Sequence, residues 1–236
     1  MENIAEQVRR ELMENAVGHR LDKHKRFFKE DIKPHGVPTP LAVRIGKEAF
    51  RQVKGAPKKT IFALCEEFWK SGYLEEGFIA CNWSYYIRKQ YEPADFRIFD
   101  KWVNEYVTNW AACDTLCNHS VGTFVEMFPE YAGKLKEWAH SDNRWVKRAA
   151  AVSLIIPARK GLFRKEIFEI ADILLTDTDD LVQKGYGWML KAAADHQKED
   201  VFEYVMSKRA VMPRTALRYA IEKMPPEMKR QAMAKV

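Results

Sequence analysis

Apolar residues recur every three or four positions along most of the chain, which is the spacing of an amphipathic helix. Residues 1–30 follow this rhythm, and residues 33–40 interrupt it because the three prolines there cannot continue a helix. From about residue 41 onward, short segments of helical periodicity alternate with turn signals, and no stretch reads as a convincing strand. The pattern predicts an all-α protein in which residues 1–40 form an N-terminal helical cap and a proline-rich turn.

The turn signals divide residues 41–236 into stacked helix pairs of similar length. The second helices of these pairs are expected to open near residues 77, 111, 144, 181 and 213. Openings roughly 32 to 37 residues apart are typical of an α-solenoid, in which each repeat packs on its neighbours. We therefore take residues 1–236 as a single repeat domain, with an irregular helical bundle as the alternative.

Two segments of the repeats, 145–150 and 181–186, can be aligned in sequence. Each follows an acidic turn and carries a cation at its fourth residue, Arg148 in the first and Lys184 in the second, 36 residues apart. Equivalent residues of a solenoid stand in a row and helix N-termini attract phosphates, so these cations predict a basic row suited to a DNA backbone. Solvated cations on exposed helix faces are the alternative. Further cations lie at or near the expected second-helix starts: Arg144, Lys147, Arg209, Arg214 and Arg218.

Charge and composition agree with a folded, basic protein. Lys and Arg number 39 against 33 Asp and Glu, which gives a formal net charge of +6 and favours polyanionic partners modestly. No apolar run approaches the roughly 18 residues that a membrane span needs, and residues 1–10 lack the apolar core of a signal peptide. Four cysteines without secretory spacing indicate a reducing compartment. We therefore expect a cytoplasmic protein with no membrane segment.

The most informative stretch is residues 109–117. On a helix, Asp114 would share one face with Trp110 and two cysteines, so a carboxylate stands on an otherwise apolar and aromatic stripe. Because burial of an unpaired charge is costly, Asp114 is either a catalytic group or a partner of a neighbouring helix start or core arginine. The two cysteines, Cys113 and Cys117, read as core residues because no fourth metal ligand is evident. No metal is expected, and no motif for a cofactor occurs.

Two further positions invite comparison with Asp114. Arg148 lies at the edge of an apolar stripe, where its long side chain is expected to reach out and pair with Asp114, bind a phosphate, or do both. Trp188 shares a stripe with Gly185, and Gly187 removes more bulk from the same helix. Something is expected to pack closely beside the indole, either another helix or a nucleotide.

Several of these segments together resemble the AlkD-type DNA alkylation repair glycosylases. The resemblance runs in register over most of the chain and rests on residues 36–40, 109–116, 141–150, 182–188 and 213–219. It implies a superhelix of HEAT-like repeats that cups duplex DNA on a basic concave face. It also implies excision of positively charged bases, such as 3-methyladenine and 7-methylguanine, from double-stranded DNA containing alkylated bases. The expected protein is a monomer that needs no cofactor.

On the matching positions, the resemblance implies roles for individual residues. Trp110 and Trp188 would contact the deoxyribose of the lesion, and Asp114 would be the catalytic carboxylate. Arg148 would hold the DNA backbone beside the lesion. The residues expected to bind DNA are Arg144, Lys147, Gln183, Lys184, Arg214, Arg218 and Phe27.

The chain departs from the family at two positions, with Ala111 where an acid is common and Phe27 where the best-known members have tyrosine. The remaining acid suits the reaction. An N3- or N7-alkylated purine is already cationic and leaves without a general acid, whereas the sugar develops oxocarbenium character that a carboxylate stabilises. The leading interpretation is therefore a monofunctional DNA glycosylase. A non-catalytic HEAT-repeat protein that binds damaged or branched DNA, and a protein-binding scaffold, are the alternatives.

Overall fold

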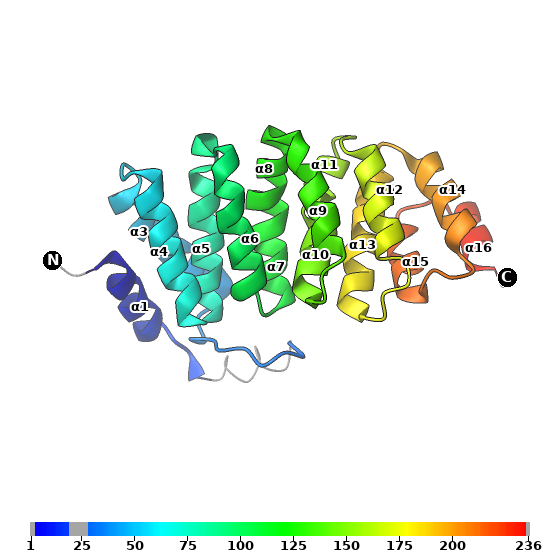
Figure 1. The fold of residues 1–236 in the computed structure, drawn as a ribbon. Coiled ribbons are helices and arrows are strands. Elements are labelled where there is room, and N and C mark those ends of the chain that lie inside the picture. Colours follow the sequence, from blue (N-terminus) through cyan, green and yellow to red (C-terminus); the bar gives the residue numbers. More distant parts are fainter. Residues whose placement is uncertain (1–2, 19–27, 235–236) are drawn as a thin grey trace. The chain divides into compact units, whose positions relative to one another are not determined.

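The structure of the chain is a computed structural model that describes residues 3–18 and 28–234. It divides into two compact units, Met1–Leu116 and Cys117–Val236. Regular structure in the described residues is helical, apart from an isolated bridge between Lys33 and Tyr73 (Figure 1), so the predicted all-α class is confirmed. No helix in this part of the chain has the length and apolarity to cross a membrane.

The first unit is built around one central helix, α5 (Leu74–Tyr86), which is buried almost all round. The helix packs against α3 (Thr39–Val53), α4 (Lys58–Ser71) and α7 (Trp110–Leu116). The described part of the unit also contains α1 (Ile4–Glu14) and α6 (Phe96–Glu105), with 3₁₀ turns at Arg88–Gln90 and Pro93–Asp95. Of the residues expected to be helical over 1–30, α1 covers residues 4–14, whereas residues 28–30 are not helical and Phe28 packs into an apolar cluster.

Two buried carboxylates of α5 hold the proline-rich segment that precedes α3. Glu75 accepts hydrogen bonds from three successive backbone N–H groups, those of residues 35–37, at 2.8, 2.9 and 3.0 Å. Glu76 accepts a hydrogen bond from Arg9 Nε at 3.0 Å and lies 3.0 Å from His35 Nε2. The break in helical structure predicted at residues 33–40 is confirmed over residues 33–38, whereas residues 39 and 40 already belong to α3. Two adjacent acids at the start of α5 hold this segment against the core.

The second unit begins with a π-helical segment, Cys117–Val121, and continues as helix pairs. Its α-helices are α8 (Gly122–Met127), α9 (Ala132–Ala139), α10 (Arg144–Val152), α11 (Ile155–Ala158), α12 (Arg164–Ile173), α13 (Asp180–Ala193), α14 (Lys198–Lys208), α15 (Arg214–Ala220) and α16 (Pro226–Met233). α10, α13 and α15 pack on one another in that order, and α9 packs against both α10 and α12. Each layer therefore contacts the equivalent layer of the next pair, as in a repeat stack.

The expected openings of the second helices are confirmed to within three residues. The helices α5, α7, α10, α13 and α15 begin at Leu74, Trp110, Arg144, Asp180 and Arg214. Local capping explains this accuracy: Asn143 Oδ1 accepts from Trp145 N at 2.9 Å, and the Asp179 carboxylate caps α13 in the same way. Arg148 and Lys184 are each the fifth residue of their helix, so their predicted equivalence is confirmed.

The missing bulk around Trp188 is filled by neighbouring helices. A Cβ atom on Gly187 would lie 2.7 Å from Tyr219 Cβ of α15, so only glycine permits this approach. A Cβ atom on Gly185 would lie 3.3 Å from Arg148 Cγ of α10. Of the two expectations for this helix, close packing of another helix is the one that the structure shows.

Candidate functional site

Helix α7 presents the two candidate residues of the first unit. The helix starts at a cap in which Asn109 Oδ1 accepts a hydrogen bond from Ala112 N at 2.9 Å. Trp110 and Asp114 lie one turn apart and are both half-buried, whereas Cys113 is fully buried. Asp114 is therefore less buried than the cysteines of the predicted stripe, and it lies with Trp110 at the partly exposed edge of that stripe.

The indole of Trp110 is stacked on the ring of Phe28, with centroids 5.4 Å apart and planes inclined by 24°. Phe28 belongs to a buried apolar cluster against which Trp110 and Ala111 pack. The other members of this cluster are Ile32, Leu74 and Phe78. Packing against the cluster holds one side of the indole, and the half-buried ring keeps part of its surface accessible. Ala111 suits its place, because an acid there would be pressed against apolar side chains.

The chain leaves α7 through the π-helical segment Cys117–Val121, so the assumption of one regular α-helix through Cys117 is wrong. Such segments are often found at functional sites. All four cysteines are free and buried, and burial raises the pKa of the Cys65 thiol. Within residues 3–18 and 28–234, no three His, Cys, Asp or Glu side chains are grouped to hold a metal ion.

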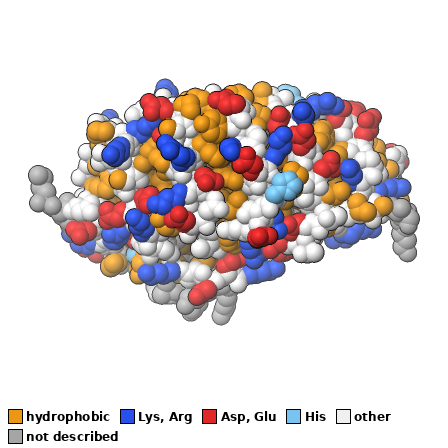
Figure 2. All heavy atoms as spheres, in the orientation of Figure 1, with side chains coloured by type: hydrophobic (Ala, Val, Ile, Leu, Met, Phe, Trp, Pro, Cys, Tyr) orange, Lys and Arg blue, Asp and Glu red, His pale blue; other side chains and the backbone are white. Residues whose placement is uncertain are grey.

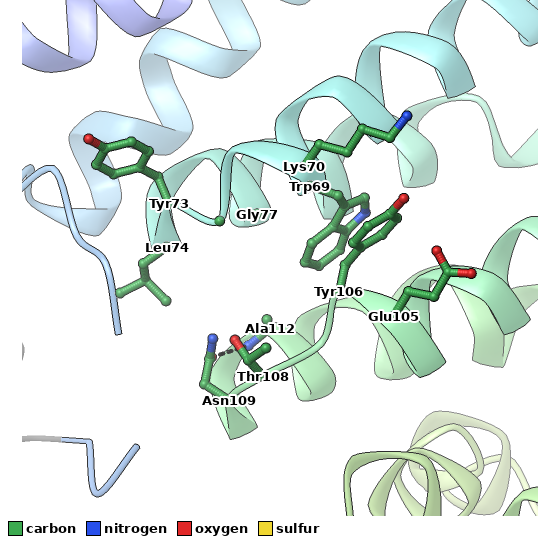
Figure 3. Close-up of a pocket in the computed structure, with 11 residues that line it drawn as sticks. Trp69, Lys70, Tyr73, Leu74, Gly77, Glu105, Tyr106, Thr108, Asn109 and Ala112 are labelled. Carbon is green, nitrogen blue, oxygen red and sulfur yellow. Dashed lines mark hydrogen bonds between the residues drawn. The ribbon is translucent and has the colours of Figure 1, made fainter. Parts of the chain in front are cut away.

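A pocket of about 210 Å³ lies in the first unit beside the start of α7 (Figure 3). Trp69 and Tyr106 form aromatic walls, and the pocket is also lined by Asn109, which caps α7, and by Ala112 of α7. Neither Trp110 nor Asp114 is among the lining residues. The pocket is therefore lined by other residues than the two candidate functional residues of α7.

In the second unit, Arg148 is buried, with 5% of its surface exposed. Its guanidinium Nη1 donates a hydrogen bond to the carbonyl oxygen of Leu181 on α13. The expectation that this side chain reaches out from packed surface is wrong, because the missing Cβ of Gly185 makes room for it between α10 and α13. A role for Arg148 at the DNA backbone stays a prediction.

Three of the expected DNA-binding cations are paired with carboxylates of the turn at residues 176–180, which we call the acidic turn. The pairs are Arg144–Asp179 at 2.8 Å, Lys147–Asp177, and Lys184–Asp180 at 3.0 Å. The structure thus gathers these cations at the first turns of α10 and α13, but it interleaves them with acids. Figure 2 shows the same mixture of Lys and Arg with Asp and Glu over the face in view.

The other expected DNA contacts differ in exposure. Gln183 is half-buried and donates a hydrogen bond to a backbone carbonyl of the acidic turn at 2.8 Å. Arg214 and Arg218 of α15 are exposed, and Trp188 of α13 is half-buried. Phe27 lies outside the described residues. Within the second unit, α15 therefore presents the most accessible of the expected cations.

Sequence reasoning missed two features of these surfaces. It did not assign Phe28 as the support of Trp110, and no local signal identifies that pair, because the two residues are 82 positions apart. It noted an acidic turn before α13 but did not pair its aspartates with cations. The sequence does contain a signal for these ion pairs, because in a stack with a period near 34 residues a turn lies against the residues one repeat earlier in the chain.

The fold and these residues define a class: an all-α protein of stacked helix pairs, with a partly exposed tryptophan and aspartate one turn apart on one second helix. The model of the DNA alkylation repair enzyme family matches residues 8–224, and the chain belongs to this family. The solved structure described as a predicted DNA alkylation repair enzyme from Enterococcus faecalis is similar, with a TM-score of 0.80 at 15% identity over 90% of this chain and 98% of that one. At this identity the likeness shows the fold. A search of curated proteins found no match.

Proposed function

We propose that the protein is a DNA glycosylase that hydrolyses the N-glycosidic bond of positively charged N3- or N7-alkylpurines in duplex DNA. The observation that carries this proposal is that Asp114 is partly exposed and lies one helical turn from an indole that is held by Phe28. Membership of the DNA alkylation repair enzyme family supports the choice of alkylated DNA as the substrate.

The reaction breaks the bond between C1′ of the deoxyribose and the purine nitrogen. The electron pair of that bond goes to the purine and cancels its positive charge, so the base leaves as a neutral molecule without a general acid. Positive charge then develops on the sugar, and water adds to C1′ with loss of a proton. Asp114 is the group that would stabilise the cationic sugar, orient the water and accept its proton.

Trp110 would add to this stabilisation through the face of its indole. A cation near an indole face gains about 0.5 to 2 kcal/mol, depending on how far the pair is desolvated. This gain requires that the ring hold its position while charge develops. The stack on Phe28 supplies that restraint, because the ring does not have to be ordered anew when DNA binds.

The second unit would bind the DNA backbone in this proposal. Lys184 stands in the first turns of α13, and Arg214 and Arg218 stand on α15. The roles that the resemblance implies for Trp188 and Arg148, a contact to the deoxyribose and a contact to the backbone, are kept as part of the proposal.

The test is to incubate the protein with methylated duplex DNA and to measure free methylpurines over time. Asp114→Asn is expected to slow their release by about 100-fold or more while duplex affinity stays nearly unchanged. Asp195→Asn is the matched control, because it neutralises an exposed aspartate of the second unit that pairs with Lys223 at 3.1 Å. Its release rate should equal that of the wild type.

Each alternative predicts a different result in the same assay. Tight duplex binding without release of bases would indicate a non-catalytic DNA-binding protein. Absence of duplex binding at low salt would indicate a protein scaffold. If Asp114→Asn loses folding and duplex binding together with activity, Asp114 is a structural residue and its catalytic role is refuted.

A further inference from the structure

The acidic turn lies among the cations that the proposed function assigns to DNA. Asp177, Asp179 and Asp180 each pair with a cation at the first turns of α10 and α13. A carboxylate on a lysine or arginine occupies the position that a phosphate oxygen would take, because both are anionic acceptors with similar hydrogen-bond lengths. The turn is therefore placed where it competes with a DNA backbone.

Two of the three aspartates also hold the backbone of the turn. Asp177 Oδ1 accepts a hydrogen bond from Asp179 N at 2.8 Å. Asp179 Oδ1 accepts from Leu181 N at 2.9 Å and from Val182 N at 3.2 Å, which caps α13. These contacts explain both residues as structural groups, and their replacement would disturb the helix start as well as the charge.

Asp180 forms a local and partly exposed ion pair. It is the first residue of α13, and its carboxylate lies 3.0 Å from Lys184 Nζ, one turn further along the helix. The side chains of Asp180 and Lys184 are 40% and 33% exposed. A pair with this exposure is weak in water, so an incoming anion can replace the carboxylate at little cost.

We propose that Asp180 sets the affinity and the salt dependence of DNA binding by competing with a backbone phosphate for Lys184. This inference rests on the proposed function. With Asp180 in place, the ammonium group is neutralised before DNA arrives, and the carboxylate repels the approaching phosphate. Without it, Lys184 contributes a full charge and releases about one more counterion when the duplex binds.

The test measures duplex affinity by fluorescence anisotropy over a range of salt concentrations. Asp180→Asn is expected to raise affinity about two- to fivefold at low salt, the range of a partly exposed ion pair. The slope of log K against log salt should steepen by up to about 0.9. In a Lys184→Gln background, the same substitution should have a clearly smaller effect on both quantities, because only the direct repulsion between the Asp180 carboxylate and the phosphate remains.

The matched control is Glu222→Gln. Glu222 pairs with Lys191 at 2.8 Å near the other end of α13, so its loss changes net charge equally and also frees a lysine. Equal effects of Asp180→Asn and Glu222→Gln, or an effect of Asp180→Asn that is undiminished without Lys184, would overturn the inference and leave the proposed glycosylase standing. Failure of the wild type to bind duplex DNA would overturn both.

Discussion

Removal of the Glu75 carboxylate is expected to loosen the N-terminal part of the first unit. The carboxylate accepts three backbone N–H groups, those of residues 35–37, all from buried residues. Each buried donor left without an acceptor costs about 1 to 3 kcal/mol, and relaxation around the shared site makes the losses less than additive. Glu75→Ala should therefore lower the free energy of unfolding by about 3 to 5 kcal/mol.

Glu75→Gln separates hydrogen bonding from charge. The amide oxygen can still accept from Gly36 and Val37, while the amide nitrogen faces the N–H group of His35. The expected loss is about 1 to 2 kcal/mol. Urea denaturation followed by circular dichroism measures both variants, with the exposed Glu48→Gln of α3 as control. A Glu75→Ala variant within 1 kcal/mol of the wild type would refute the reasoning.

Two further substitutions test packing and charge. Gly187→Ala should destabilise by about 1 to 3 kcal/mol, because its Cβ would lie 2.7 Å from Tyr219 Cβ, whereas Gly133→Ala, with open space around it, should be neutral or stabilising in thermal melts. A hydrogen bond from Lys101 lowers the pKa of Glu66, so the stability this carboxylate contributes is present above its unfolded pKa and is lost as pH falls through the folded value. Glu66→Gln should therefore cost about 0.5 to 1 kcal/mol near pH 7, and an equal deficit at about pH 3 would contradict this account.

The helix starts were predictable because their determinants are local. Asn143 and Asp179 cap the helices that follow them, and both caps lie within three residues of the donors they satisfy. Prolines mark the segment before α3 in the same local way. The spacing of these signals sufficed to place the second helices and to make Arg148 and Lys184 equivalent.

The surroundings of the site residues were not predictable from the same signals. Whether Arg148 is buried depends on Gly185, a residue of the next repeat that leaves space for the guanidinium. Whether Lys184 is a free cation depends on Asp180, and a pattern of charges alone does not show which pairs form. Glu75 carried no sequence signal of burial, since two acids at a helix start usually face solvent and the helix dipole.

The alanine at residue 111 connects the packing of the first unit to the proposed chemistry. A carboxylate there would lie against the cluster around Phe28, where burial without a partner is costly, and alanine leaves that cluster free to support Trp110. The proposed substrates make a second acid unnecessary, because a cationic purine leaves without being protonated. In the proposed reaction, Asp114 alone would stabilise the sugar. A neutral base would need a proton to leave, and so the same arrangement would restrict the proposed enzyme to bases that already carry positive charge.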